Sequence, residues 1–210
     1  MKGTWIVESQ SKSIKARFEG VTAGLVDWLA RKGVTAMQVS MAGLVGTLVG
    51  AVMIAAGDFW FGPWVFALSS TIDALDGALA RRTGTVSEWG AFVDSTLDRV
   101  GEGAGFAAIA VWFALQGEAV GVALAVTAQL GGNLTSYIRA LAEARGIECT
   151  EGWVGRPGRV FIFSLLLFLQ QPMLMIILLT IASCATAAQR AFIVYRGLAE
   201  LSRGPAGTRS

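Results

Sequence analysis

The chain has no histidine and only two cysteines among its 210 residues. The absence of histidine excludes a histidine general base and the usual histidine-containing zinc sites. Cys149 and Cys184 are too far apart in the sequence to form a paired metal-binding motif. Charged residues are also scarce, at 15%, whereas 54% of the residues are hydrophobic. This balance is typical of proteins that lie in a lipid bilayer rather than in water.

Long apolar runs are the feature that the chain has instead, and a helix needs about 20 mostly apolar residues to cross the hydrocarbon core. The runs are Gln38–Ala56, Phe61–Ala80, Ala91–Leu115, Val120–Leu141, Pro157–Leu169 and Pro172–Tyr195. We therefore predict an all-α integral membrane protein with six transmembrane helices, forming one domain over residues 34–197. The fifth run is short, and we expect it to cross with help from its polar start or in a thinner bilayer.

The segment before the first run, residues 1–33, predicts a different kind of helix. Between Lys12 and Lys32, charged residues alternate with apolar residues spaced three and four apart, namely Ile14, Phe18, Val21, Leu25, Trp28 and Leu29. This spacing favours an amphipathic helix on the membrane surface, and an ordinary polar leader is the alternative. Because the first apolar run begins beyond residue 33, we expect no cleavable signal peptide.

The positions of the basic residues predict the orientation in the membrane. The 17 lysines and arginines fall in four places: Lys2, Lys12, Lys15, Arg17, Arg31 and Lys32; Arg81, Arg82 and Arg99; Arg139, Arg145, Arg156 and Arg159; and Arg190, Arg196, Arg203 and Arg209. The connections around Asp58, Glu118 and Gln171 contain none. Positive charge marks the cytoplasmic side, so we expect a multi-pass protein of the cell membrane with both termini, including the tail 198–210, in the cytoplasm.

Four aspartates beside two of the apolar runs are the strongest indication of function. Asp73 and Asp76 are three residues apart, and Asp94 and Asp98 are four apart, so each pair lies on one face of its helix. Both pairs are at the predicted cytoplasmic ends of neighbouring antiparallel helices. The short turn between these helices would let all four carboxylates point toward one place.

Four carboxylates in a low-dielectric site cannot all stay ionised unless cations compensate them. Oxygen ligands suit Mg²⁺ or Mn²⁺, and four of them can hold two ions about 3.5–4 Å apart, the spacing used to bind a phosphoryl group. Small residues nearby, Gly77, Ala80, Gly84 and Gly90, leave space for a phosphate-bearing ligand. The alternative is that the aspartates are solvated charges paired with Arg81, Arg82 and Arg99.

The spacing of these residues resembles the signature of the CDP-alcohol phosphotransferase family, D-x2-D-G-x2-A-R-x8-G-x3-D-x3-D. The matching residues are Asp73, Asp76, Gly77, Ala80, Arg81, Gly90, Asp94 and Asp98. The resemblance implies a six-helix membrane enzyme, expected to be a homodimer. Such an enzyme moves the phosphoalcohol half of a CDP-alcohol onto an acceptor hydroxyl and releases CMP.

The resemblance also implies roles for individual residues. Asp73, Asp76 and Asp94 would ligate two Mg²⁺ or Mn²⁺ ions, and Asp98 would complete the second site and act as the general base. Gly77 and Arg81 would contact the CDP group, with Arg81 pairing with the diphosphate.

Three further residues are candidates for contacts with the CDP-lipid. Ser87 matches a family position that touches the nucleotide, although it is equally well explained as a turn residue. Many family members have Thr-Pro-Asn before the first span, but this chain reads "TAMQVS" over residues 35–40. The Pro and Asn are absent, and Gln38 and Ser40 are the polar residues that remain there.

The segments "SYIRALAEARG" (Ser136–Gly146) and "GRPGR" (Gly155–Arg159) bear on the acceptor. Five polar or basic residues fall at predicted cytoplasmic helix ends: Ser136, Arg139, Arg156, Arg159 and Arg190. Several arginines around one pocket suit a dianionic phosphate. The segments resemble those of actinobacterial phosphatidylinositol-phosphate synthases, with an arginine at 139 in place of their lysine. Alternatively, these arginines only follow the positive-inside rule.

This resemblance implies CDP-diacylglycerol as donor, inositol phosphate as acceptor and the lipid bilayer as environment, with no nucleic-acid partner. Glycerol 3-phosphate as the acceptor and an archaeal CDP-lipid as the donor are variants of the same chemistry. A cation-coupled transporter is a remote alternative, because the aspartates lie at one end of helices that have no glycine-proline interruption. Glu102 is one turn beyond Asp98, where it is expected to position Arg99 or a metal-bound water, or to form a simple ion pair.

Overall fold

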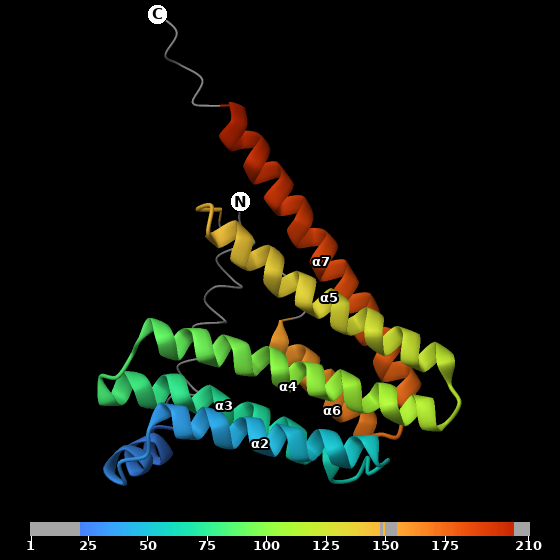
Figure 1. The fold of residues 1–210 in the computed structure, drawn as a ribbon, viewed down its shortest axis with the longest axis horizontal. Helices are drawn as coiled ribbons and strands as arrows, with labels where there is room; N and C mark the ends of the chain where they lie inside the picture. The colour runs from blue at the N-terminus through green and yellow to red at the C-terminus, as the bar shows by residue number, and fades with distance from the viewer. Residues whose placement is uncertain (1–21, 148, 150–154, 204–210) are drawn as a thin grey trace, which may run out of the picture. The chain divides into compact units, whose positions relative to one another are not determined.

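The computed structural model describes residues 22–147, 149 and 155–203, which are helical with no strand among them. Within these ranges, the side chains at 73, 74, 156 and 200–203 are outside the description. The labelled helices of Figure 1 are α2 (Ala36–Ala55), α3 (Gly62–Thr83), α4 (Glu88–Leu115), α5 (Ala119–Glu143), α6 (Arg156–Phe168) and α7 (Pro172–Arg203). The prediction of an all-helical fold is confirmed, and each predicted apolar run coincides with one of these helices.

Two of these helices are long and apolar enough, by length and composition, to cross a membrane: α2, and α7 over Pro172–Ala199. The apolar part of α6, Pro157–Phe168, is shorter than this requires. The six crossings therefore stay a prediction. Residues 22–31 are also helical, but residues 12–21 of the predicted surface helix lie outside the described part of the chain.

Polar caps extend two of the helices beyond their apolar runs. At the start of α2, the N–H of Gln38 donates to Thr35 Oγ1 at 3.3 Å, and the N–H of Thr35 donates to Gln38 Oε1 at 3.0 Å. This reciprocal pair is a capping box. At the start of α4, Ser87 Oγ accepts a hydrogen bond from the N–H of Gly90 at 3.0 Å. These caps satisfy N–H groups that have no partner inside the helix.

The chain divides into two compact units. The first unit comprises described residues up to 46 together with 68–98, and the second comprises 47–67 together with the described residues from 99 onward. In the first unit, Val26 from helical residues 22–31 is buried with Val39 of α2 and with Leu75 and Leu79 of α3. The middle of α2 and the first half of α3 also approach closely, because a Cβ added at Gly46 would lie 2.2 Å from Ser69 Oγ.

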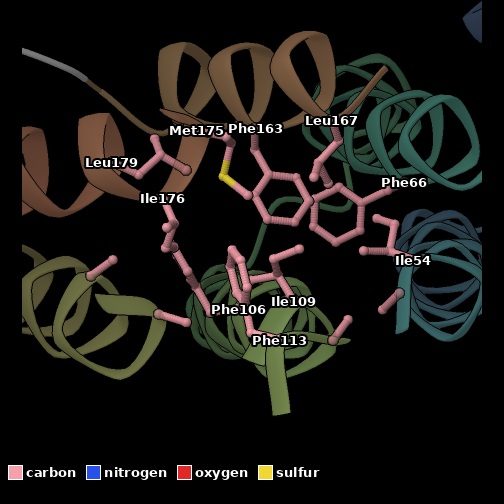
Figure 2. Packing of buried hydrophobic residues seen from close by; sticks show 14 of the residues in the cluster. Ile54, Phe66, Phe106, Ile109, Phe113, Phe163, Leu167, Met175, Ile176 and Leu179 are labelled. Carbon is pink, nitrogen blue, oxygen red and sulfur yellow. The ribbon is translucent and has the colours of Figure 1, made fainter. Parts of the chain in front are cut away.

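The second unit has an aromatic core. The ring centroids of Phe66 and Phe163 are 5.1 Å apart, and those of Phe106 and Phe163 are 6.2 Å apart. Figure 2 shows these rings meeting, with Met175 and Leu179 of α7 in the same cluster. Helices α5 and α7 lie side by side (Figure 1). The core thus fixes the four helices that carry the polar residues of this unit.

Candidate functional site

A buried carboxylate on α3 is held by a hydroxyl from α2. Ser40 Oγ donates to Asp76 Oδ2 and also lies 3.1 Å from the carbonyl oxygen of Ala36. Both side chains are buried within the first unit. A carboxylate away from water needs such a donor, because burial without hydrogen bonds is costly for a charged group. The structure therefore places Ser40, a predicted CDP-lipid contact, directly on a predicted metal ligand.

The other signature aspartates are in the same unit. Asp94 and Asp98 lie on α4, both half-buried and both engaged in polar interactions. Asp73 is in α3, but its side chain is outside the description. Among the described side chains, which do not include that of Asp73, no three His, Cys, Asp or Glu residues lie close enough to hold a metal ion. The carboxylate chemistry fits Mg²⁺ or Mn²⁺, and the four-aspartate site stays a prediction.

The residues that follow Asp76 on α3 form an exposed basic end. A Cβ added at Gly77 would lie 3.4 Å from Nη1 of Arg81, so the Arg81 side chain folds back over this glycine. Arg82 Nε pairs with Asp27 Oδ1 at 2.6 Å. The hydrogen bond and charge of Arg82 lower the pKa of Asp27 below its usual value of 3.8. Arg82 therefore has its partner in the N-terminal helical segment, whereas the predicted alternative placed it on the signature aspartates.

Two predicted nucleotide contacts have structural roles in the fold. Gln38 caps α2 and Ser87 caps α4, as described above. The turn-residue interpretation of Ser87 thus agrees with its hydrogen bond. Contact of either residue with a nucleotide stays a prediction.

In the second unit, two arginines are buried and make specific polar contacts. Arg159 Nε of α6 donates to Glu102 Oε1 of α4 at 2.7 Å. Arg190 Nη1 of α7 donates to the carbonyl oxygen of Thr135 on α5 at 2.9 Å. The side chains of the Arg159–Glu102 pair are 6% and 13% exposed, so water screens this pair very little.

A third arginine joins these two. Arg190 contacts α5 at Thr135, one turn before Arg139, and the charges of Arg139, Arg159 and Glu143 all act on Arg190. Arg139 is exposed, and its Nε pairs with Glu143 Oε1 at 2.7 Å. Positive charges that lie close together repel each other and favour a bound anion. Convergence of Arg139, Arg159 and Arg190 on one acceptor phosphate stays a prediction.

The remaining predicted acceptor residues are Ser136 and Arg156. Ser136 is half-buried on α5, one turn before Arg139. Arg156 begins α6, but its side chain is outside the description.

Sequence reasoning missed the carboxylate and carbonyl partners of the arginines. Glu102 forms an ion pair, which is one of the alternatives proposed, and its partner is Arg159. No local pattern reveals this pair, because 57 residues separate its members. By contrast, the i,i+4 spacing of Arg139 and Glu143 was a usable signal.

Comparisons with known proteins identify the family to which the chain is similar. The sequence profile of the CDP-alcohol phosphatidyltransferase family matches residues 34–194. The phosphatidylinositol phosphate synthase of Cutibacterium acnes is 38% identical over 150 residues, which cover 70% of this chain and 72% of that protein. The synthase of the same name from Streptomyces avermitilis is 37% identical over 155 residues, which cover 72% of this chain and 64% of that protein.

The fold is similar to that of the Mycobacterium tuberculosis phosphatidylinositol phosphate synthase. The crystal structure of that synthase with CDP-DAG bound has a TM-score of 0.78 and 28% identity, covering 83% of this chain and 94% of that chain. The crystal structure of the same synthase in complex with manganese and citrate has a TM-score of 0.77 and 29% identity, covering 83% and 88% of the two chains.

Proposed function

Because the chain belongs to the CDP-alcohol phosphatidyltransferase family, we propose that it transfers the phosphatidyl group of CDP-diacylglycerol to inositol phosphate. The membership confirms the resemblance that the Asp73–Asp98 signature predicted. The observation that carries the acceptor proposal is that two arginines of the second unit, Arg159 and Arg190, are buried, and that Arg190 contacts α5 one turn before Arg139. A phosphorylated acceptor needs such a cluster, whereas a neutral polyol does not.

In the proposed reaction, a hydroxyl oxygen of inositol phosphate attacks the β-phosphorus of CDP-diacylglycerol. The phosphoanhydride bond breaks, and CMP leaves with the bridging oxygen. The acceptor's proton passes to Asp98, since the chain has no histidine to accept it. The products are phosphatidylinositol phosphate and CMP.

The donor end of the site is proposed to lie on the signature residues. Asp73, Asp76, Asp94 and Asp98 would hold divalent cations, two per site, Mg²⁺ or Mn²⁺. Bound there, the ions would neutralise the charge that develops on the diphosphate. The hydrogen bond from Ser40 fixes one oxygen of Asp76 for this role. The manganese-bound structure of the M. tuberculosis synthase supports this choice of metal class.

Arg81 is proposed to pair with the diphosphate. Its guanidinium lies over Gly77 on the exposed end of α3. Because Gly77 has no side chain, a phosphate could approach the backbone of α3 at this position. Gln38 and Ser87 are proposed to border the same nucleotide site.

The acceptor phosphate is proposed to bind the arginines of the second unit. Arg139, Arg159 and Arg190 supply forked N–H donors, with Ser136 one turn from Arg139. Arg156 is proposed to join them from the start of α6. Glycerol 3-phosphate carries the same phosphate monoester, so the cluster would also accept it, and the acceptor comparison below distinguishes the two.

The proposed setting is a cell membrane crossed six times, with the site and both termini on the cytoplasmic side. The grouping of basic residues supports this orientation. The helical residues 22–31 are proposed to be part of a surface helix, because exposed Leu25 and Trp28 give them an apolar face beside Arg31 and Lys32. We further propose that the protein is a homodimer, as the family resemblance implies.

The experiment is a CMP-release assay on the purified protein with CDP-diacylglycerol and three labelled acceptors: inositol phosphate, free inositol and glycerol 3-phosphate. We expect faster turnover with inositol phosphate than with glycerol 3-phosphate and no turnover with free inositol. The reaction should require Mg²⁺ or Mn²⁺ and should be abolished by EDTA. Preference for glycerol 3-phosphate would contradict the acceptor assignment, and turnover in EDTA would contradict the metal site.

A pair of matched variants tests the general base. Asp98→Asn should lower the turnover rate by at least about 10²-fold, the contribution expected of general-base catalysis. Asp58→Asn is the control, because Asp58 Oδ1 accepts hydrogen bonds from the N–H groups of Trp60 and Phe61, which an asparagine oxygen also accepts. Equal turnover of Asp98→Asn and Asp58→Asn would show that Asp98 is not the general base.

A further inference from the structure

The ion pair between Glu102 and Arg159 differs from the other two ion pairs described above. Its side chains are 6% and 13% exposed, compared with 63% and 45% for Arg82–Asp27 and 48% and 50% for Arg139–Glu143. Burying two charges costs desolvation energy that their attraction repays only in good geometry, so such a pair is weak evidence for a role in stability. A role in fixing one arrangement of the site explains its presence better.

The surroundings of Glu102 are arranged around its carboxylate. A Cβ added at Gly132 of α5 would lie 3.4 Å from Glu102 Oε1, so the carboxylate rests against this glycine. From there it accepts the hydrogen bond of Arg159 Nε at 2.7 Å. The pair thus links α4 to α6 beside α5, within the second unit.

The contact at Nε has a consequence for the whole side chain. A guanidinium is planar, and its donors form a rigid fork. A hydrogen bond at Nε of a buried arginine therefore sets the orientation of the plane in which the Nη groups lie. The orientation matters because a forked phosphate contact depends on this plane.

Arg159 shares the second unit with two other arginines. Arg190 bonds the carbonyl oxygen of Thr135, one turn before Arg139 on α5, and the charge of Arg159 acts on Arg190. Without a counter-charge, Arg159 would lower its energy by turning away from the other two arginines. Glu102 opposes this movement from the side of Nε and keeps Arg159 in the cluster.

We propose that Glu102 is a positioning residue for the acceptor: it orients Arg159 so that the arginine cluster binds the phosphate of the acceptor. This inference rests on the proposed function, in which that cluster is the acceptor site. It predicts that loss of the Glu102 charge weakens binding of the phosphorylated acceptor and leaves the CDP-lipid unaffected.

The test measures kcat and KM for each substrate in the purified full chain. Glu102→Gln keeps the shape of the side chain but removes its charge. We expect the KM for inositol phosphate to rise about tenfold, the effect of weakening one charge-assisted hydrogen bond. The kcat and the KM for CDP-diacylglycerol should stay close to their wild-type values. Glu102→Asp, which retains the charge, should recover part of the loss.

Glu118→Gln is the matched control. Glu118 is exposed in the connection before α5 and makes no side-chain capping bond there. The same chemical change at this position should leave both KM values unchanged. A purely structural role of Glu102 would instead lower the melting temperature and kcat for every acceptor without a selective change in KM, and that result would overturn the inference.

A double-mutant cycle tests whether Glu102 acts through Arg159. Arg159→Lys keeps the charge but removes the planar fork, so it should also raise the KM for inositol phosphate. In that background, Glu102→Gln should add no further increase, and independent, additive effects would contradict the proposal. If Glu102→Gln does not fold, Glu102→Asp replaces it in the cycle: it should raise the KM for inositol phosphate in the wild type and add no further increase in the Arg159→Lys background.

The two proposals fail in distinguishable ways. If the wild-type protein does not use inositol phosphate, the proposed function is wrong. If it does, and Glu102→Gln has the wild-type KM or a lower one, only the role of Glu102 is wrong.

Discussion

Ser40 of α2 donates a hydrogen bond to the carboxylate of Asp76 on α3, and both side chains are buried. Hydrogen bonds to an ionised acceptor are about twice as strong as those between neutral groups. The contact therefore fixes one oxygen of a proposed metal ligand before any metal binds. It also ties α2 to α3 at the site that the signature aspartates define.

The first prediction removes this donor. In Ser40→Ala, the Mg²⁺ or Mn²⁺ concentration that gives half-maximal CMP release should rise by about tenfold or more, because partners of metal ligands tune metal affinity. A metal titration of CMP release measures this. Thr127→Ala is the control, since Thr127 Oγ1 donates to the carbonyl oxygen of Ala123 within its own helix. Identical metal titrations for Ser40→Ala and the wild type would show that Ser40 does not affect metal binding.

The sequence was sufficient to predict the helices but not their ends. Hydropathy identified the third run as Ala91–Leu115, whereas α4 begins at Glu88. It also ended the fourth run at Leu141, whereas α5 continues to Glu143. The added residues include the charged Glu88 and Glu143, and the cap at Ser87 and the Arg139–Glu143 pair stabilise these helix ends. Apolar runs indicate burial in lipid or protein, but backbone hydrogen bonds decide where a helix stops.

In the candidate site, the local patterns could be predicted from the sequence, but the long-range contacts could not. The spacing of Asp94 and Asp98 within one helix, and the signature around Asp76, could be read from the chain because they are local patterns. The contacts of Glu102 with Arg159, and of Arg190 with Thr135, join residues 57 and 55 positions apart. Such pairs depend on how the helices pack, and no local pattern of residues specifies them.

The second prediction concerns pH. Arg82 lowers the pKa of Asp27 below 3.8, so the unfolded chain binds more protons than the folded chain in that range. The stabilisation by this pair should be complete well above pH 3.8 and should disappear as the pH falls through the lowered pKa. Asp27→Asn should therefore reduce the melting temperature slightly at pH 7 and have no effect at pH values below the folded-state pKa. Melting curves of both proteins from pH 7 down to pH values below 3.8 would test this linkage, because the difference in melting temperature should shrink as the pH falls.

Salt provides the control for that measurement. The Asp27 and Arg82 side chains are 45% and 63% exposed, so ions screen their attraction. The difference between the wild type and Asp27→Asn at pH 7 should shrink in high salt. A difference that persists in high salt would assign the effect of Asp27 to something other than its charge.

The third prediction tests the close approach of α2 and α3. A Cβ at position 46 would lie 2.2 Å from Ser69 Oγ and 2.9 Å from Ser69 Cβ, closer than these atoms can stay. Gly46→Ala should therefore lower the free energy of unfolding by about 1–3 kcal/mol, despite the better helix propensity of alanine. In a Ser69→Gly background, the same change should cost less. Gly24→Ala is the control, because no atom lies within 4 Å of the added Cβ; a similar loss there would show that the α2–α3 contact is not the cause.

The fourth prediction concerns the aromatic core of the second unit. Phe163 is buried against Phe66 and Phe106 (Figure 2), and its removal would leave a cavity among rigid rings. Phe163→Ala should lower the free energy of unfolding by about 3–5 kcal/mol. Phe161→Ala is the matched control two residues away on α6, because the Phe161 side chain is 65% exposed. Denaturant titrations in detergent measure both values.

The same core holds α6, which carries Arg159, so Phe163→Ala protein that remains folded should also bind inositol phosphate more weakly. If Phe161→Ala is as destabilising as Phe163→Ala, burial within this core does not account for the stability of the unit.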